Sequence, residues 1–166
     1  MSFMRNEENL CYMLRRLPDA VAVVGGRSEN SGPYGTVKFY GSESGVLVVA
    51  DILGLPAPAL ECEGRIFGFH IHDGSECSGN DADPFADAGS HYNPSGCPHP
   101  YHAGDMPPLF GAGGRAFLAF LTDRVSVDEI IGKAVVIHDR PDDFTTQPSG
   151  NAGNKIACGV ISRVRR

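Results

Sequence analysis

The sequence predicts an all-β domain built from short strands and tight turns. Glycine and proline number 21 and 12 among 166 residues, and both favour turns over long helices. Apolar residues recur in short runs that end at glycine or proline, which is the pattern of β-strands. Hydrophobic residues form 42% of the chain and charged residues 20%, so these strands can enclose a single core.

The chain begins with a segment of different character. Apolar side chains recur at helical spacing from Leu10 until Pro18, which predicts a short helix over residues 7–17. We therefore expect residues 1–18 to be an N-terminal extension and residues 19–166 to form the main domain.

The rest of the chain alternates between apolar runs and polar stretches. Two stretches, 73–110 and 139–154, show almost no periodicity, and a turn of helix is expected within 123–131. A loop as long as the first is typical of a functional segment, or of one held by a metal or a disulfide. Strands are expected at 20–24, 36–40, 46–52, 65–72, 115–122, 133–138 and 156–162.

Charge and hydropathy exclude several classes of partner. The formal net charge is -6 and the basic residues are scattered, so we expect no nucleic-acid partner. No apolar run approaches the roughly 20 residues that span a bilayer, so no membrane partner is expected. The first residues lack the apolar core of a secretory signal, which favours a cytoplasmic location.

The histidines carry the first chemical signal. His70 and His72 alternate on an expected strand, so both rings share one face. Alone, such a pair is compatible with a solvated strand face. The long loop and a later strand add further donors, however, and imidazoles in this number exceed the needs of one zinc ion and suit two adjacent metals such as copper and zinc. These further donors are His91, His99, His102, Asp105 and His138.

Several ordered motifs between residues 20 and 162 carry a family resemblance. They are Gly68-Phe-His-Ile-His-Asp73, Gly89-Ser-His-Tyr-Asn-Pro94, His102-Ala-Gly-Asp105, Val136-Ile-His-Asp139, Asp142-Asp-Phe-Thr-Thr-Gln-Pro148 and Gly150-Asn-Ala-Gly-Asn-Lys-Ile-Ala-Cys-Gly-Val-Ile161. Together they make the chain resemble the copper/zinc superoxide dismutases, most closely the bacterial form. The resemblance implies an eight-stranded Greek-key β-sandwich or barrel with two long functional loops.

The resemblance also implies the cofactors, the substrate and the reaction. Superoxide would be converted to dioxygen and hydrogen peroxide as copper alternates between Cu(II) and Cu(I). His91 would bridge copper and zinc and act as a catalytic proton carrier. The implied copper ligands are His70, His72, His91 and His138, and the implied zinc ligands are His91, His99, His102 and Asp105.

Other positions receive roles from the same resemblance. Asp142 would link ligand imidazoles of the two metals, and Cys77 and Cys158 would form a disulfide. Lys155 stands where the family usually has an arginine that attracts superoxide; lysine keeps the charge but lacks the planar fork. Cys97 is interpreted as an unpaired loop thiol, with a thiolate zinc ligand as the alternative.

Two other functions remain open from the sequence. A noncatalytic member of the family would buffer or transfer copper or zinc with the same donors. A single-zinc hydrolase is less favoured, since no general base stands beside an open zinc position. Either a monomer or a homodimer is compatible with the resemblance.

Overall fold

Strands dominate the protein, as predicted. The computed structural model describes residues 10–28, 32–58, 60 and 64–165. Within these residues, two short α-helices, α1 (Leu10–Met13) and α2 (Val127–Ile130), and one 3-10 helix, η2 (Ala86–Ala88), accompany the strands. The strands are β1 (Ala20–Val24), β2 (Tyr34–Ser42), β3 (Gly45–Leu53), β4 (Ile66–Phe67), β5 (Phe69–His72), β6 (Leu109–Phe110), β7 (Ala116–Thr122), β8 (Ala134–His138) and β9 (Lys155–Arg163).

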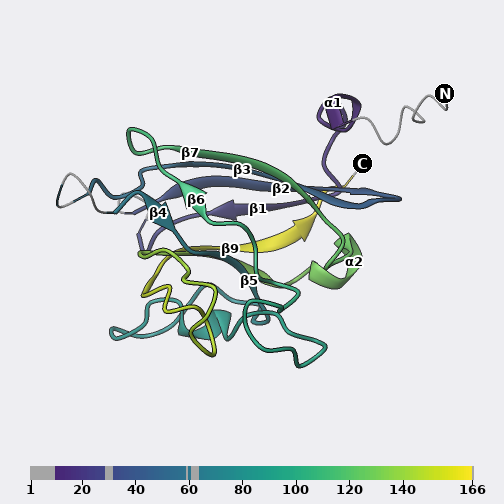
Figure 1. Ribbon diagram of the computed structural model, residues 1–166. Helices are drawn as coiled ribbons and strands as arrows, with labels where there is room; N and C mark the ends of the chain where they lie inside the picture. The colour runs from purple at the N-terminus through teal and green to yellow at the C-terminus, as the bar shows by residue number, and fades with distance from the viewer. Residues whose placement is uncertain (1–9, 29–31, 59, 61–63, 166) are drawn as a thin grey trace.

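The strands form one curled antiparallel sheet and a small ribbon. The seven-stranded sheet has the order β5-β8-β9-β1-β2-β3-β7, and β4 pairs with β6. The chain passes from β4 directly into β5 and from β6 into β7, so the ribbon connects the two ends of the sheet. Figure 1 shows β7, β3 and β2 as one layer over β9 and β5. The core between the layers is apolar and includes the fully buried Phe39, Phe67, Phe69, Ile71 and Ile137.

Two predicted boundaries were wrong, and both errors arise from contacts with distant parts of the chain. The strand expected over 65–72 is broken at Gly68, whose N–H donates to Arg140 O at 2.7 Å and whose O accepts from His138 N–H at 2.8 Å. A Cβ at Gly68 would lie 2.9 Å from the Ala152 Cβ, so glycine allows this close passage. The loop expected through residue 110 ends earlier, because its last two residues form β6.

The N-terminal helix is shorter in the described residues than predicted. α1 ends at Met13, and the next turn tightens as Arg16 N–H donates to Met13 O. Met13 is buried against Tyr40 and Leu47 on the outer side of the sheet. Residues 1–9 lie outside the described residues, and the domain boundary at 18 stays a prediction. No described helix is long and apolar enough to cross a bilayer.

The two long loops lie together beneath β5 and β9 (Figure 1). The first loop also pairs with β5 on the side that β8 does not occupy. Ile71 N–H donates to Gly104 O at 2.9 Å, and Ile71 O accepts from Tyr92 N–H at 2.8 Å. Isolated bridges join His70 to Asp105 and His72 to His91 in the same region. The loop is thereby fixed to the strand that carries two of the histidines.

Candidate metal centre

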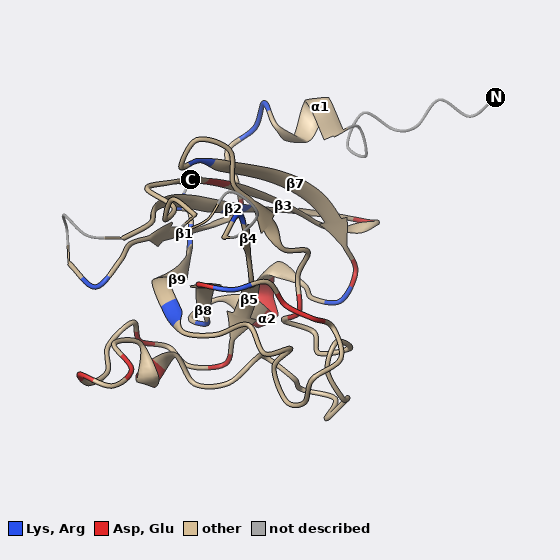
Figure 2. Cartoon of the chain, turned by 60° about the vertical axis from the view of Figure 1, so that its left-hand side comes forward, with Lys and Arg blue, Asp and Glu red and all other residues tan. Residues whose placement is uncertain are grey.

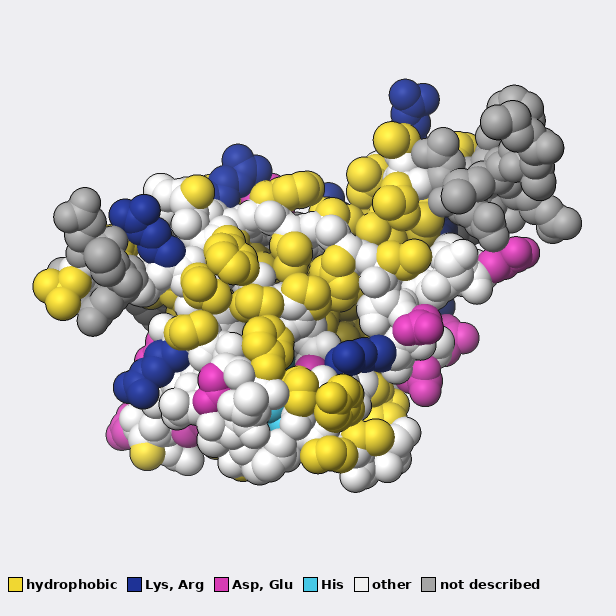
Figure 3. All heavy atoms as spheres, in the orientation of Figure 1, with side chains coloured by type: hydrophobic (Ala, Val, Ile, Leu, Met, Phe, Trp, Pro, Cys, Tyr) yellow, Lys and Arg dark blue, Asp and Glu magenta, His cyan; other side chains and the backbone are white. Residues whose placement is uncertain are grey.

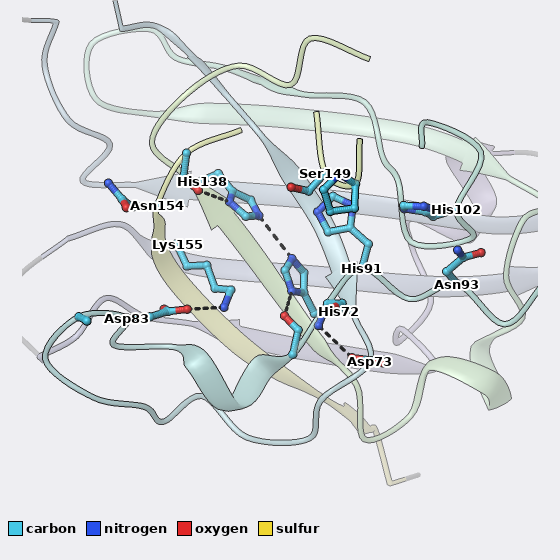
Figure 4. Close-up of a pocket in the computed structure, with 15 residues that line it drawn as sticks. His72, Asp73, Asp83, His91, Asn93, His102, His138, Ser149, Asn154 and Lys155 are labelled. Carbon is cyan, nitrogen blue, oxygen red and sulfur yellow. Dashed lines mark hydrogen bonds and ion pairs between the residues drawn. The ribbon is translucent and has the colours of Figure 1, made fainter. Parts of the chain in front are cut away.

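All six histidines of the chain meet in one buried cluster beside β5. They form two sets whose ligand atoms lie within 4.8 Å of one another, and His91 belongs to both. β5 supplies His70 and His72, β8 supplies His138, and the first loop supplies the rest. Figure 4 shows the rings of His72, His91 and His138 converging. The sets are His70, His72, His91 and His138, and His91, His99, His102 and Asp105, which are the two groups expected from the sequence.

In the first set, His72 and His138 face each other through nitrogens that both lack a proton. His72 Nδ1 donates to Gly89 O at 2.9 Å and His138 Nδ1 donates to Gly153 O at 3.2 Å. Each neutral ring therefore has an acceptor at Nε2, and the two Nε2 atoms lie 3.3 Å apart. Burial lowers the pKa of His72 well below its usual value and that of His138 to about 3. A shared cation accounts for two acceptors held this close.

Asp142 links the two sets from behind. Its Oδ2 accepts from His70 Nε2 at 2.8 Å, and its Oδ1 accepts from His99 Nε2 at 2.9 Å. Burial raises the pKa of Asp142, but hydrogen bonds from His70, Phe144 N–H and His99 outweigh it and lower this pKa to about 2. The remaining atoms, His70 Nδ1 and His99 Nδ1, are buried without a hydrogen-bond partner. Both are free to bind a metal.

The second set closes around Asp105. His91 Nδ1 lies 2.7 Å from Asp105 Oδ1, while Asp105 Oδ2 lies 3.1 Å from His99 Nδ1 and 3.3 Å from His102 Nδ1. The last two contacts are close but do not have hydrogen-bond geometry. Both nitrogens are therefore buried without a hydrogen-bond partner. Tetrahedral ligands about 2.0–2.1 Å from zinc are separated by roughly 3.3 Å. The nitrogens of His99 and His102 lie at about this spacing from Asp105, whereas His91 Nδ1 lies closer because it is hydrogen-bonded to the carboxylate. Three imidazoles and a carboxylate are a donor set that suits zinc.

A cavity of about 610 Å³ opens onto the first set. His72, His91 and His138 line it, and Lys155 reaches it from the start of β9. Lys155 Nζ donates to Asp83 Oδ2 at 2.6 Å and to Phe85 O at 3.1 Å, and Figure 4 shows this ion pair beside His138. Lys155 is the only lysine or arginine among the described residues that line the cavity.

Comparison with known proteins decides the family. The family model "copper/zinc superoxide dismutase" matches residues 33–161. Superoxide dismutase [Cu-Zn] 2 of Aquifex aeolicus is 36% identical over 142 residues, covering 76% of this chain and 78% of the relative. Superoxide dismutase [Cu-Zn] of Deinococcus radiodurans is 33% identical over 148 residues, covering 78% of each chain.

The chain belongs to the copper/zinc superoxide dismutase family. Its reaction is the dismutation of superoxide to dioxygen and hydrogen peroxide, with copper and zinc as cofactors. The Bacillus subtilis relative named superoxide dismutase-like protein YojM is 33% identical over 113 residues, but covers only 59% of this chain. The comparisons and the two complete donor sets thus favour the enzyme over a noncatalytic metal carrier.

The disulfide expected for this family is present. Cys77 and Cys158 are bonded, with Cα atoms 5.6 Å apart, and tie the first loop to β9. Cys97 is a half-buried free thiol and does not belong to either set of metal-binding groups among the described residues, so the thiolate alternative is not supported.

Several site groups were missed by sequence reasoning. The carbonyl groups of Gly89 and Gly153 orient two ligands, but any residue carries a carbonyl group, so no residue type signals this role. Asp83 lies in a stretch without periodicity, 72 residues before its partner Lys155, and only the fold brings them together.

Proposed function

We propose a specific ligand atom for each metal. His70 Nδ1 and the Nε2 atoms of His72, His91 and His138 would hold copper, and the Nδ1 atoms of His91, His99 and His102 would hold zinc together with Asp105. The observation that carries this assignment is the pair of facing acceptor nitrogens on His72 and His138, 3.3 Å apart. Support comes from His70 Nδ1 and His91 Nε2, which are buried without a partner. The hydrogen bond from His70 Nε2 to Asp142 fixes the tautomer of the His70 ring.

His91 is the proton carrier in this proposal. Copper supplies one-electron oxidation and reduction when bound, which zinc with its filled d shell cannot. The His91 ring lines the cavity while its Nδ1 lies against Asp105, so Nε2 is the nitrogen that would carry a proton on the substrate side whenever it is not bound to copper. Proton transfer from a positioned imidazole to a peroxide oxygen is the chemistry that the second half of dismutation needs.

Lys155 is the residue that attracts superoxide. The substrate is an anion and the protein carries a formal net charge of -6, so the average field repels it. Lys155 lines the cavity next to His138, with which it pairs in the β8–β9 register. Its side chain is only 14% exposed, so its ammonium stays close to the cavity wall.

Metal analysis and two variants test the assignment. The parent protein is expected to bind one ion each of copper and zinc per chain and to dismutate superoxide. His138→Ala is expected to lose copper and activity while it keeps zinc, because His138 belongs only to the first set. His102→Ala, the matched variant of the second set, is expected to lose zinc preferentially. Zinc loss from His138→Ala with copper retained would contradict the assignment.

A further inference from the structure

We propose that Asp83 is a positioning residue that fixes the Lys155 ammonium at the cavity and leaves it ready to bind a small anion. The inference rests on the proposed role of Lys155 in attracting superoxide. It assigns to Asp83 the orienting function that a planar guanidinium would supply by itself, because lysine has a flexible stem.

The turn that carries Asp83 is held by its own hydrogen bonds. Asn80 Oδ1 accepts from the N–H groups of Ala82 and Asp83 at 2.9 and 3.0 Å, and Asn80 N–H donates to Asp83 O at 2.9 Å. Asp83 Oδ1 then accepts from Phe85 N–H at 3.0 Å. The backbone of the loop thus fixes one carboxylate oxygen and leaves Oδ2 for Lys155.

Lys155 meets a fixed pair of acceptors on this turn. Its Nζ donates to Asp83 Oδ2 at 2.6 Å and to Phe85 O at 3.1 Å. An ammonium group has three donors, so one N–H remains after these two bonds. Figure 4 shows Lys155 extending from β9 between Asp83 and the His72–His138 pair. The third donor is therefore available to an anion beside the histidines.

Asp83 also brings a negative charge to the cavity, which opposes anion binding. Asp73 and Asp83 both line the cavity with Lys155, so two carboxylates stand against one ammonium. If Asp83 acted only through its charge, replacing it with a neutral residue would strengthen anion binding whichever residue occupied position 155. If it acts by positioning Lys155, the effect of its removal depends on Lys155, and a double-mutant cycle separates the two cases.

Azide titration of the copper- and zinc-loaded protein, followed by visible absorption, measures anion binding without turnover. In the Lys155→Met background, Asp83→Asn is expected to tighten azide binding about threefold, since only a charge is lost. With Lys155 present, the same change is expected to leave affinity unchanged or weaken it. Asp81→Asn is the matched control, because Asp81 lies on the same turn but pairs with Arg27 at 2.6 Å. It is expected to have the same small effect in both backgrounds.

Equal effects of Asp83→Asn in the two backgrounds would overturn the proposal. Asp83→Glu gives a second measurement that keeps the charge while displacing the carboxylate; weaker azide binding is expected only when Lys155 is present, and unchanged binding there would also overturn it. If Lys155 does not attract anions, the result is different: Lys155→Met alone leaves azide binding unchanged. Metal content is measured for every variant.

Discussion

Hydrogen bonds at single imidazole nitrogens orient the metal-binding nitrogens of the site. The carbonyl oxygens of Gly89 and Gly153 each hold one nitrogen of His72 and His138, and Asp142 holds one nitrogen of His70 and of His99. The opposite nitrogen of each ring is thereby left as an acceptor. Burial lowers the pKa values of His70, His72 and His138, so these three rings are neutral and able to bind a cation at neutral pH.

The same burial predicts that the metal-free protein loses stability in mild acid. The folded-state pKa of His138 is about 3 against 6.5 for the free group, so between these values the unfolded chain binds the extra proton. The contribution of this burial to the free energy of unfolding is complete above pH 6.5. As the pH is lowered below 6.5, the free energy of unfolding decreases by about 1.4 kcal/mol per pH unit for each such histidine. Urea unfolding of metal-free protein between pH 7 and 5 measures the slope, and His138→Gln should reduce it. A flat profile would contradict this expectation.

At this scale the sequence identifies the donors but not their orientation. Histidine and aspartate side chains with the right spacing can be recognised along the chain, as His70, His72 and Asp105 were. Which nitrogen binds metal depends on backbone oxygens and on Asp142, which reach the rings only after folding. The ion pair of Lys155 with Asp83 could not be predicted for the same reason.

At the scale of elements, the second loop needs glycine to pack over the site. Gly150 has φ +68, and a Cβ there would lie 2.0 Å from Asp142 Oδ1 and 2.6 Å from His99 Nε2. Its N–H also donates to Thr146 O at 2.7 Å, while its O accepts from Asp143 N–H. The loop therefore covers Asp142 closely only because no side chain stands at this position.

We predict that Gly150→Ala disrupts the link between the two donor sets. The added methyl must displace Asp142 or the loop, so zinc and copper affinity are expected to fall by about tenfold or more. Gly113→Ala is the matched control, because Gly113 has φ +59 but nothing within 4 Å of its Cβ position. It carries the strain of a positive φ without the collision. Competition titrations with a chelator compare the two, and equal metal affinities would refute the expected role of Gly150.

The disulfide between Cys77 and Cys158 gives a second prediction for the elements. It closes a segment of 81 residues, so its loss frees the unfolded chain and loosens the first loop from β9. Reduction, or the Cys77→Ser and Cys158→Ser double variant, is expected to lower the free energy of unfolding by about 2–4 kcal/mol. Denaturant unfolding of the oxidised and reduced protein measures it. Cys97→Ser, which removes a thiol outside the disulfide, should leave stability nearly unchanged.

Most strands could be predicted from the sequence, and the exceptions follow from tertiary contacts. The apolar runs of β1, β3, β7 and β8 are long enough to show their pattern. β6 has two residues and is a strand only because β4 lies beside it. The break at Gly68 likewise depends on Arg140 and His138, which come much later in the chain.

At the scale of the whole molecule, the distribution of charge and apolar surface bears on substrate and partners. Segment 73–87 of the first loop contains five acidic residues and no lysine or arginine, and Figure 2 shows these acids on the loops below the sheet. Superoxide therefore approaches past negative charge, which makes the cation beside the cavity more important. Figure 3 shows apolar side chains gathered on one face. Phe110 and Phe117 are among the exposed apolar residues of the described part of the chain. The monomeric or homodimeric state and the cytoplasmic location stay predictions.

The pairing of the first loop with β5 has a consequence for self-association. β5 is the last strand of the seven-stranded sheet, and Gly104 and Tyr92 occupy the backbone groups that a further strand would use. Both residues adjoin metal-binding positions, so we expect removal of the metals to loosen this cover and expose the sheet edge. Such an edge can recruit a strand from another molecule. We expect the metal-free protein to form β-rich aggregates on warming, detected by light scattering, while the metal-loaded protein stays clear. The metals are thus expected to protect this sheet edge from aggregation as well as to serve catalysis.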